Sequence, residues 1–132
     1  VHDRDAPGTL VNITSGAARS VYEGWAVYCA TKAAVDQLTR VVAAEEAAHG
    51  LAAFAVAPGV VDTDMQALIR DTPPDRFPSV TRFRDLKAAN AFNAPTWVGA
   101  CILELHRAAS TGDLPDWVPN SDPVVVRVPP EV

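Results

Sequence analysis

A serine, a tyrosine and a lysine are spaced so that they could carry out proton transfer at a carbon–oxygen bond. Ser15 lies thirteen positions before Tyr28, and Lys32 lies four positions after it. On a helix, positions i and i+4 share a face, so the phenol and the ammonium can enter one site. A nearby cation stabilises phenolate over phenol, and such a tyrosine can exchange a proton with an alcohol or carbonyl oxygen. Because the Ser15 hydroxyl could hold that oxygen, the set predicts the acid–base half of a carbonyl reduction.

Two apolar runs predict the strands that position these residues. Residues 8–13 (Gly-Thr-Leu-Val-Asn-Ile) follow a Pro-Gly turn, and residues 51–57 (Leu-Ala-Ala-Phe-Ala-Val-Ala) are closed by Pro58 and Gly59. Both runs have the length and composition of buried strands. Ser15 would therefore lie at the carboxyl end of a strand, where open α/β sheets bind ligands.

The segment between the runs predicts a long helix that carries the tyrosine and the lysine. We expect it to extend from about Gly24 or Trp25 to Ala48, because it is rich in strong helix formers and Gly50 is a natural stop. Strand, helix and strand of these lengths make a right-handed βαβ unit with parallel strands. Its buried stripe at helical spacing is expected to be Val35, Leu38 and Val42.

Three segments together resemble the C-terminal half of the short-chain dehydrogenase/reductase family. They are Asn12-Ile13-Thr14-Ser15-Gly16, Tyr28-Cys29-Ala30-Thr31-Lys32-Ala33-Ala34 and Ala57-Pro58-Gly59-Val60-Val61-Asp62-Thr63-Asp64-Met65. Their joint spacing is far more specific than any one segment. Residues 24–30 and 62–66 further resemble the sepiapterin reductase and benzil reductase branch.

The resemblance implies an α/β fold, a Rossmann-like doubly wound parallel sheet, of which this chain has only the C-terminal half, about three strands with helices. We expect residues 1–132 to be a single partial domain. Within it, residues 8–65 would be the catalytic βαβ core, 66–94 a substrate lid and 95–128 the final helix and strand.

The resemblance also implies a role for each site residue. Ser15 would orient and polarise the substrate carbonyl, Tyr28 would donate the proton, and Lys32 would assist Tyr28 and bind the nicotinamide ribose. The cofactor would be NADP or NAD, with NADP favoured by the branch, and it would carry the hydride. The residues expected against the nicotinamide, besides Tyr28 and Lys32, are Pro58, Gly59, Val61 and Thr63.

The glycine-rich turn that receives a pyrophosphate in this family is missing from the sequence. The seven glycines form no such cluster. The residue that selects NAD or NADP and the helix asparagine of the family's catalytic set are missing as well. Since Val1 is not methionine, we expect a truncated sequence; a partner chain that supplies the other half and a degenerate gene product are the alternatives.

Composition fits a soluble, acidic α/β protein, and the family resemblance implies a small-molecule carbonyl substrate as its partner. Hydrophobic residues make up 48% and the formal net charge is −5. No basic patch suggests nucleic acid, and no apolar run is long enough to span a membrane, so we expect a cytoplasmic protein. The cysteines and histidines lack metal-ligand spacing. Cys29 is expected to be a small core residue rather than a nucleophile.

The segment after Met65 predicts a lid over the site. Residues 65–70 are helical in pattern, and residues 71–75 with two prolines break the helix. In the family a mobile lid stands here, which closes over the cofactor and excludes water; a surface linker is the alternative. One of its four arginines could bind an acidic substrate or a cofactor phosphate, but none is named as a site.

The C-terminal part predicts a helix and one more strand. Pro95 suits the first turn of the helix, which would stop by Gly112. Residues 112–118 match the family's strand position, whereas 124–128 have the better β-propensity. We expect the former in the sheet and the latter as an extended tail. The helix's buried stripe is expected to be Val98, Cys101, Ile102 and Leu105.

Two kinds of residue are candidates for substrate binding. Asp116 stands four places after Gly112, where sepiapterin reductases carry an aspartate that holds the pterin; a turn aspartate is the alternative. A carboxylate suits the paired N–H donors of such a ring. Trp25 and Trp117 could stack on an aromatic substrate, although Trp25 could equally be a packing residue.

These observations predict an NAD(P)H-dependent oxidoreductase that reduces a small ketone or diketone to an alcohol. The alternative is a non-catalytic fragment or subunit that lacks the nucleotide-binding half and is inactive alone. A sugar-nucleotide epimerase uses the same Tyr-x-x-x-Lys pair but needs a larger C-terminal domain. Family members are usually dimers or tetramers, so a homo-oligomer is expected of the full-length protein.

Overall fold

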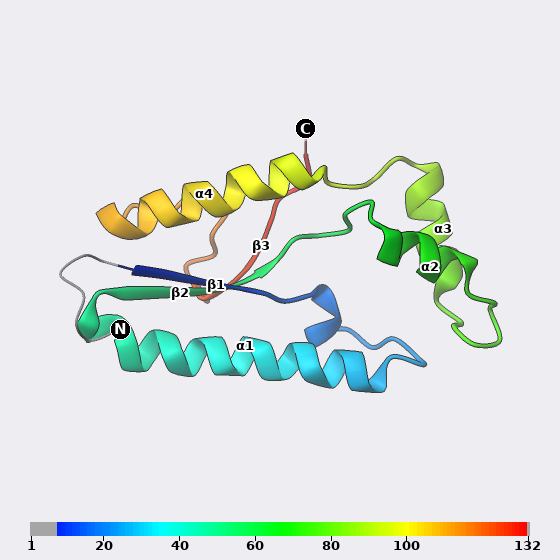
Figure 1. The fold of residues 1–132 in the computed structure, drawn as a ribbon, viewed down its shortest axis with the longest axis horizontal. Coiled ribbons are helices and arrows are strands. Elements are labelled where there is room, and N and C mark those ends of the chain that lie inside the picture. Colours follow the sequence, from blue (N-terminus) through cyan, green and yellow to red (C-terminus); the bar gives the residue numbers. More distant parts are fainter. Residues whose placement is uncertain (1–7, 132) are drawn as a thin grey trace.

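Three parallel strands form one sheet with a long helix on each face (Figure 1). The computed structural model describes residues 8–131. The strands are ordered β1 (Gly8–Ile13), β2 (Leu51–Ala57) and β3 (Val125–Arg127). Helix α1 (Ala26–Glu46) lies on one side and α4 (Pro95–Thr111) on the other. The predicted α/β fold, a Rossmann-like parallel sheet of about three strands wound on both faces, is confirmed.

The βαβ unit at the start of this fold follows the predicted bounds closely. β1 and β2 pair in parallel from Gly8 opposite Leu51 to Ile13 opposite Val56. The long helix ends in a 3₁₀ turn, η2 (Ala47–His49), after which Gly50 takes a left-handed φ of 74°. That conformation reverses the chain into β2 at little cost, because glycine has no Cβ.

The last strand differs from the prediction. The sheet strand is β3, whose Val125 and Arg127 pair with Ala55 and Ala57 of β2, whereas residues 112–118 form turns after α4. The expectation that 112–118 enters the sheet was wrong. The carbonyl of Pro115 accepts a turn hydrogen bond from Val118. A proline lacks the N–H that a paired strand uses, while the valines around β3 suit a pleated, buried position.

The core between the sheet and α4 is apolar. Of the stripe expected on α4, Val98, Cys101 and Leu105 are buried and Ile102 is half-buried. β3 contributes Val126, and Val128 directly after the strand joins the same cluster. The buried members of this cluster are Phe54, Val56, Val98, Cys101, Leu105, Val118, Val126 and Val128.

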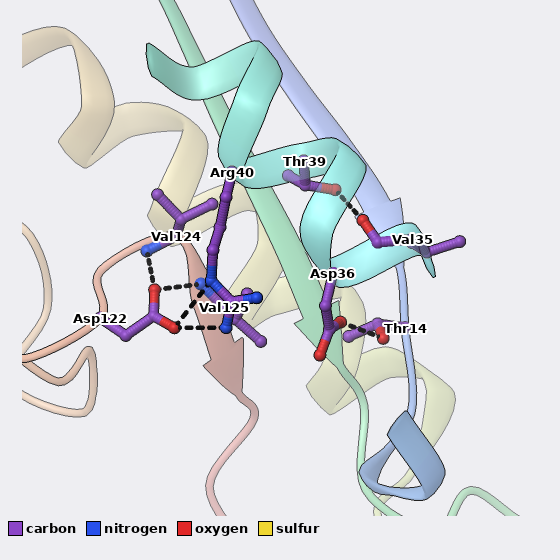
Figure 2. Close-up of polar contacts among 8 residues, drawn as sticks. All are labelled: Thr14, Val35, Asp36, Thr39, Arg40, Asp122, Val124 and Val125. Atoms are coloured by element: carbon purple, nitrogen blue, oxygen red, sulfur yellow. Dashed lines mark hydrogen bonds and ion pairs between the residues drawn. The ribbon is translucent and has the colours of Figure 1, made fainter. Parts of the chain in front are cut away.

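The opposite face is held by polar contacts, which the sequence analysis did not anticipate. Leu38, expected in a buried stripe, is 58% exposed, whereas Asp36 and Thr39 are the buried residues of α1. The Thr39 hydroxyl accepts a hydrogen bond from the Asn12 amide at 3.0 Å and donates to the Val35 carbonyl at 2.7 Å (Figure 2). The hydrogen bonds rotate α1 so that polar positions meet β1.

An ion pair connects α1 with the segment that leads into β3. The Arg40 guanidinium lies 2.8 Å from Asp122, and the same carboxylate accepts hydrogen bonds from the N–H groups of Val124 and Val125 (Figure 2). These contacts place the start of β3 against the helix.

Residues 64–93 contain two short helices beyond the carboxyl ends of β1 and β2 (Figure 1). They are α2 (Asp64–Asp71) and α3 (Val80–Ala88), which pack on each other. Buried residues of the two helices and of the segment between them form an aromatic-rich cluster against which Tyr22 and Trp25 pack; its members are Ile69, Phe77, Val80 and Phe83. The segment therefore has structure of its own; its role as a lid stays a prediction. Within residues 8–131, no helix combines the length and apolar character needed to cross a bilayer.

Candidate active site

A cavity of about 350 Å³ opens at the carboxyl ends of the strands. Of the nine residues predicted for the site, only Asp116 does not line this cavity. The eight that do are Ser15, Trp25, Tyr28, Lys32, Pro58, Gly59, Val61 and Thr63. Residues from β1, α1, the loop after β2 and the segment at α2 thus meet in one place.

Ser15 comes two residues after β1 and begins the 3₁₀ helix η1 (Gly16–Ala18). Its backbone is extended, and its hydroxyl oxygen accepts a hydrogen bond from the Ala17 N–H at 3.1 Å. A hydroxyl can accept and donate at once. The bond therefore orients the side chain and leaves the Ser15 proton to donate into the cavity.

Tyr28 and Lys32 lie one turn apart on α1. The Lys32 ammonium lies 5.8 Å from the centroid of the Tyr28 ring and donates to the Ile13 carbonyl at 2.9 Å. An ammonium has three donors, so this bond anchors the lysine at the end of β1 and leaves donors for a ligand.

A buried hydrogen bond fixes the distance between β1 and α1. Thr14, which directly precedes Ser15, is 2% exposed and donates to the carboxylate of Asp36, which is 3% exposed (Figure 2). Because Asp36 lies one turn beyond Lys32, this contact holds the serine and the lysine together. The sequence signal was a pair of polar residues, Asp36 and Thr39, in an alanine-rich helix.

The loop after β2 is held by Asn93, a residue that the sequence analysis missed. Its side-chain amide donates to the Pro58 carbonyl and its backbone N–H donates to the Val60 carbonyl, each at 2.9 Å. Gly59 between them has φ +78°, and a Cβ there would lie 2.8 Å from the Asn93 amide nitrogen. Asn93 is distinguished only by its burial and by its place before α4. No local sequence motif signals these two properties.

The end of this loop begins α2. Thr63 takes the capping position with an extended backbone, but its side chain makes no capping hydrogen bond, so the hydroxyl is available at the cavity. Asp62 next to it accepts a hydrogen bond from Lys87 at 2.5 Å and pairs with Arg70 at 3.3 Å. The Lys87 ammonium, reinforced by Arg70, lowers the pKa of Asp62. These pairs tie the loop to α2 and α3.

Trp25 is a packing residue as well as a lining residue. Its ring stacks on Phe77 with centroids 4.4 Å apart and meets Tyr28 edge-on at 5.4 Å. Asp116 is exposed in the turn after α4 and lies outside the cavity lining, because the segment 112–118 is not the sheet strand. Trp117 also lies elsewhere, with its indole donating to Glu104 at 3.0 Å.

The cavity has a cationic lining. Lys32, Arg82 and Arg127 line it, and among the described residues no aspartate or glutamate does. The sequence analysis named no role for Arg127, because it expected residues 124–128 outside the sheet. Within residues 8–131, no group of three or more histidine, cysteine or acidic side chains is placed to hold a metal ion.

The family model described as short chain dehydrogenase matches residues 2–74. The chain belongs to the short-chain dehydrogenase family. Benzil reductase ((S)-benzoin forming) of Bacillus subtilis is 39% identical over 99 residues, which cover 74% of this chain and 41% of that protein. Sepiapterin reductase of Mus musculus is 48% identical over 75 residues, covering 54% of this chain and 28% of that protein.

The fold similarity extends over most of the chain. A crystal structure of a short-chain dehydrogenase/reductase from Saccharomyces cerevisiae superimposes with a TM-score of 0.72 at 28% identity, covering 91% of this chain and 45% of that one. The chain thus spans less than half the length of these relatives.

Proposed function

We propose that this chain carries the catalytic and substrate-binding residues of an NAD(P)H-dependent carbonyl reductase that converts a small ketone or diketone to an alcohol. One observation carries the proposal: Ser15, Tyr28 and Lys32 line one cavity at the carboxyl ends of a parallel sheet. The likeness to benzil and sepiapterin reductases supports the choice of a small carbonyl substrate.

The proposed chemistry assigns one task to each side chain. The Ser15 hydroxyl donates a hydrogen bond to the substrate carbonyl oxygen and polarises it. Tyr28 delivers its phenolic proton to that oxygen as the alcohol forms. Lys32, held at the Ile13 carbonyl, stabilises the phenolate that is left behind.

The residues present fit the nicotinamide end of a cofactor. Lys32 keeps free donors for ribose hydroxyls, the Thr63 hydroxyl makes no capping bond, and the loop from Pro58 to Val61 is held rigid by Asn93. When bound, the cofactor supplies the hydride. We propose NADP rather than NAD on the likeness to the sepiapterin reductase branch.

A second reading is a non-catalytic subunit. The chain covers 41% of the Bacillus subtilis relative, and the 132 residues contain no glycine cluster for a pyrophosphate. Under this reading the chain contributes its site residues only when another chain supplies the nucleotide-binding half.

The two readings are separated by binding and turnover. NADPH and NADH binding is measured by isothermal calorimetry on the folded, unaggregated 132-residue chain and on the expressed polypeptide that contains it. Benzil reduction is then followed with Tyr28→Phe and with Tyr22→Phe as the matched control. We expect Tyr28→Phe to abolish turnover and Tyr22→Phe to keep at least half of it. Near-normal turnover of Tyr28→Phe would sink the catalytic assignment, and binding only in the longer polypeptide would favour the subunit reading for the chain alone.

A further inference from the structure

The cavity is positively charged in a protein of negative net charge. Its lining contains Lys32, Arg82 and Arg127 and, among the described residues, no acidic side chain, although the formal net charge of the chain is −5. Asp62, which lies between the lining residues Val61 and Thr63, is paired with Lys87 and Arg70. The described lining therefore holds three cations and no acidic side chain.

Two of the three cations have contacts that explain their position. Lys32 is hydrogen-bonded to the Ile13 carbonyl, and the guanidinium of Arg82 lies 5.4 Å from the centroid of the Tyr22 ring. Arg127 is exposed, and within residues 8–131 it forms no ion pair or side-chain hydrogen bond. Within the described residues the side chains of Arg82 and Arg127 both make no hydrogen bond, but the Arg82 guanidinium lies over the Tyr22 ring, whereas Arg127 has no ring contact and is free to turn toward a ligand.

Strand geometry delivers Arg127 to the cavity. Side chains alternate between the two faces of a strand, and Val126 and Val128 are buried in the cluster with α4. Arg127 between them therefore projects from the face that α1 covers. It pairs with Ala57, the residue directly before the Pro58–Gly59 loop, and the small side chain of Ala57 leaves room for the arginine stem.

We propose that Arg127 binds a carboxylate on the carbonyl substrate, so that the preferred substrate is a keto acid rather than a neutral ketone or diketone. A guanidinium presents paired N–H donors that match the two oxygens of a carboxylate. Ser15, Gly59 and Arg127 follow or end β1, β2 and β3, so the reacting carbonyl and the anion lie along one edge of the sheet. This inference rests on the proposed carbonyl reduction.

The test compares substrates that differ by one charge. The expressed polypeptide that contains this chain is assayed with benzoylformate and 3-benzoylpropionate, which differ in the spacing of ketone and carboxylate, and with their methyl esters. The variants are Arg127→Gln, Arg127→Lys and, as the matched control, Arg107→Gln, an exposed arginine of α4 outside the cavity.

We expect kcat/KM for at least one acid to exceed that for its ester. Arg127→Gln should lower kcat/KM for the acid at least tenfold more than for the ester, chiefly through KM, and Arg127→Lys should restore part of the loss. Arg107→Gln should change kcat/KM by no more than twofold for either the acid or the ester. Equal losses for acid and ester, or no preference for either acid, would overturn the inference while leaving carbonyl reduction intact.

Two further outcomes separate the sources of the anion and the two proposals. If Arg127→Gln weakens NADPH or NADH binding more than fivefold, the anion is a cofactor phosphate and the substrate assignment is overturned. If no ketone is reduced, carbonyl reduction fails, and calorimetric binding of benzoylformate decides the inference. If benzoylformate binds the unmodified protein and Arg127→Gln abolishes that binding, the carboxylate site is supported. If benzoylformate does not bind, or binds the variant equally well, the inference is overturned.

Discussion

The side-chain amide of Asn93 donates a hydrogen bond to the Pro58 carbonyl across 2.9 Å. The same side chain accepts a hydrogen bond from the Glu131 N–H at 3.0 Å, and Asn93 is 7% exposed. One buried residue therefore joins the loop after β2, the start of α4 and the C-terminal segment. The loop shape proposed to receive the nicotinamide depends on a residue more than thirty positions away in sequence.

Replacing this residue should destabilise the protein. Asn93→Ala removes two side-chain hydrogen bonds, and the half-buried Pro58 carbonyl loses its partner, which costs about 1–3 kcal/mol for a buried unpaired group. The matched control is Asn120→Ala, at an exposed position, where a change within about 0.5 kcal/mol is expected. Urea unfolding of the expressed protein measures both. Equal urea midpoints for the two variants would contradict the conclusion that Asn93 holds these three segments together.

Gly59 should not accept a side chain. Gly59→Ala places a Cβ 2.8 Å from the Asn93 amide nitrogen at a φ of +78°, and the left-handed conformation alone costs about 1–2 kcal/mol. Gly99 in α4 is the matched control, because a Cβ there meets nothing within 4 Å. Gly99→Ala should stabilise by up to about 1 kcal/mol. Thermal unfolding should therefore shift in opposite directions, and a shift in the same direction would refute the steric argument.

Lys32→Ala should impair both turnover and cofactor binding. It removes the ammonium beside Tyr28 and its anchor at the Ile13 carbonyl, and general acid–base catalysis of this kind contributes about 10²–10⁴-fold. Lys87→Ala is the control, since Lys87 pairs with Asp62 and does not line the cavity. The assay is ketone reduction with NADPH, together with calorimetry. Full turnover in Lys32→Ala would exclude the proposed role.

Asp122 should make stability depend on pH in the acid range. Partial burial by itself raises the pKa of Asp122, but hydrogen bonds from Arg40 and the Val125 N–H outweigh it and lower the pKa. A carboxyl whose folded pKa is lowered stabilises the fold above its unfolded pKa of about 3.9 and loses that contribution as pH falls toward the folded value. The paired side chains are 39% and 33% exposed, so solvent screening holds the effect below about 1 kcal/mol.

Unfolding free energies at pH 6 and pH 3 test this sign. Asp122→Asn should lose less stability between the two pH values than the unmodified protein does. Asp113→Asn, at an exposed position after α4, should follow the unmodified protein. If Asp122→Asn loses as much stability between pH 6 and pH 3 as the unmodified protein, the ion pair contributes nothing to the acid dependence.

Local pattern was enough to predict the elements that carry Ser15, Tyr28 and Lys32. The first two strands match at every residue and α4 begins at Pro95 as expected, because apolar runs, a first-turn proline and stop glycines act over a few positions. The three residues meet in the fold because Ser15 follows β1, while Tyr28 and Lys32 lie one turn apart on α1, the next long element of the chain. These features, and the family, follow from the sequence by itself.

Only the tertiary structure decided which segment completes the sheet, which face α1 buries, and what surrounds the site. β3 rather than 112–118 enters the sheet: local β-propensity favoured residues 124–128 and the family's strand position favoured 112–118, and the choice was made by valines that fill the space against α4. Leu38 turns outward because Thr14 and Asn12 bind Asp36 and Thr39 across the chain. Asn93 and Arg127 reach the site through strand pairing and loop contacts between distant segments. Such contacts depend on packing complementarity, which exists only once the chain has folded.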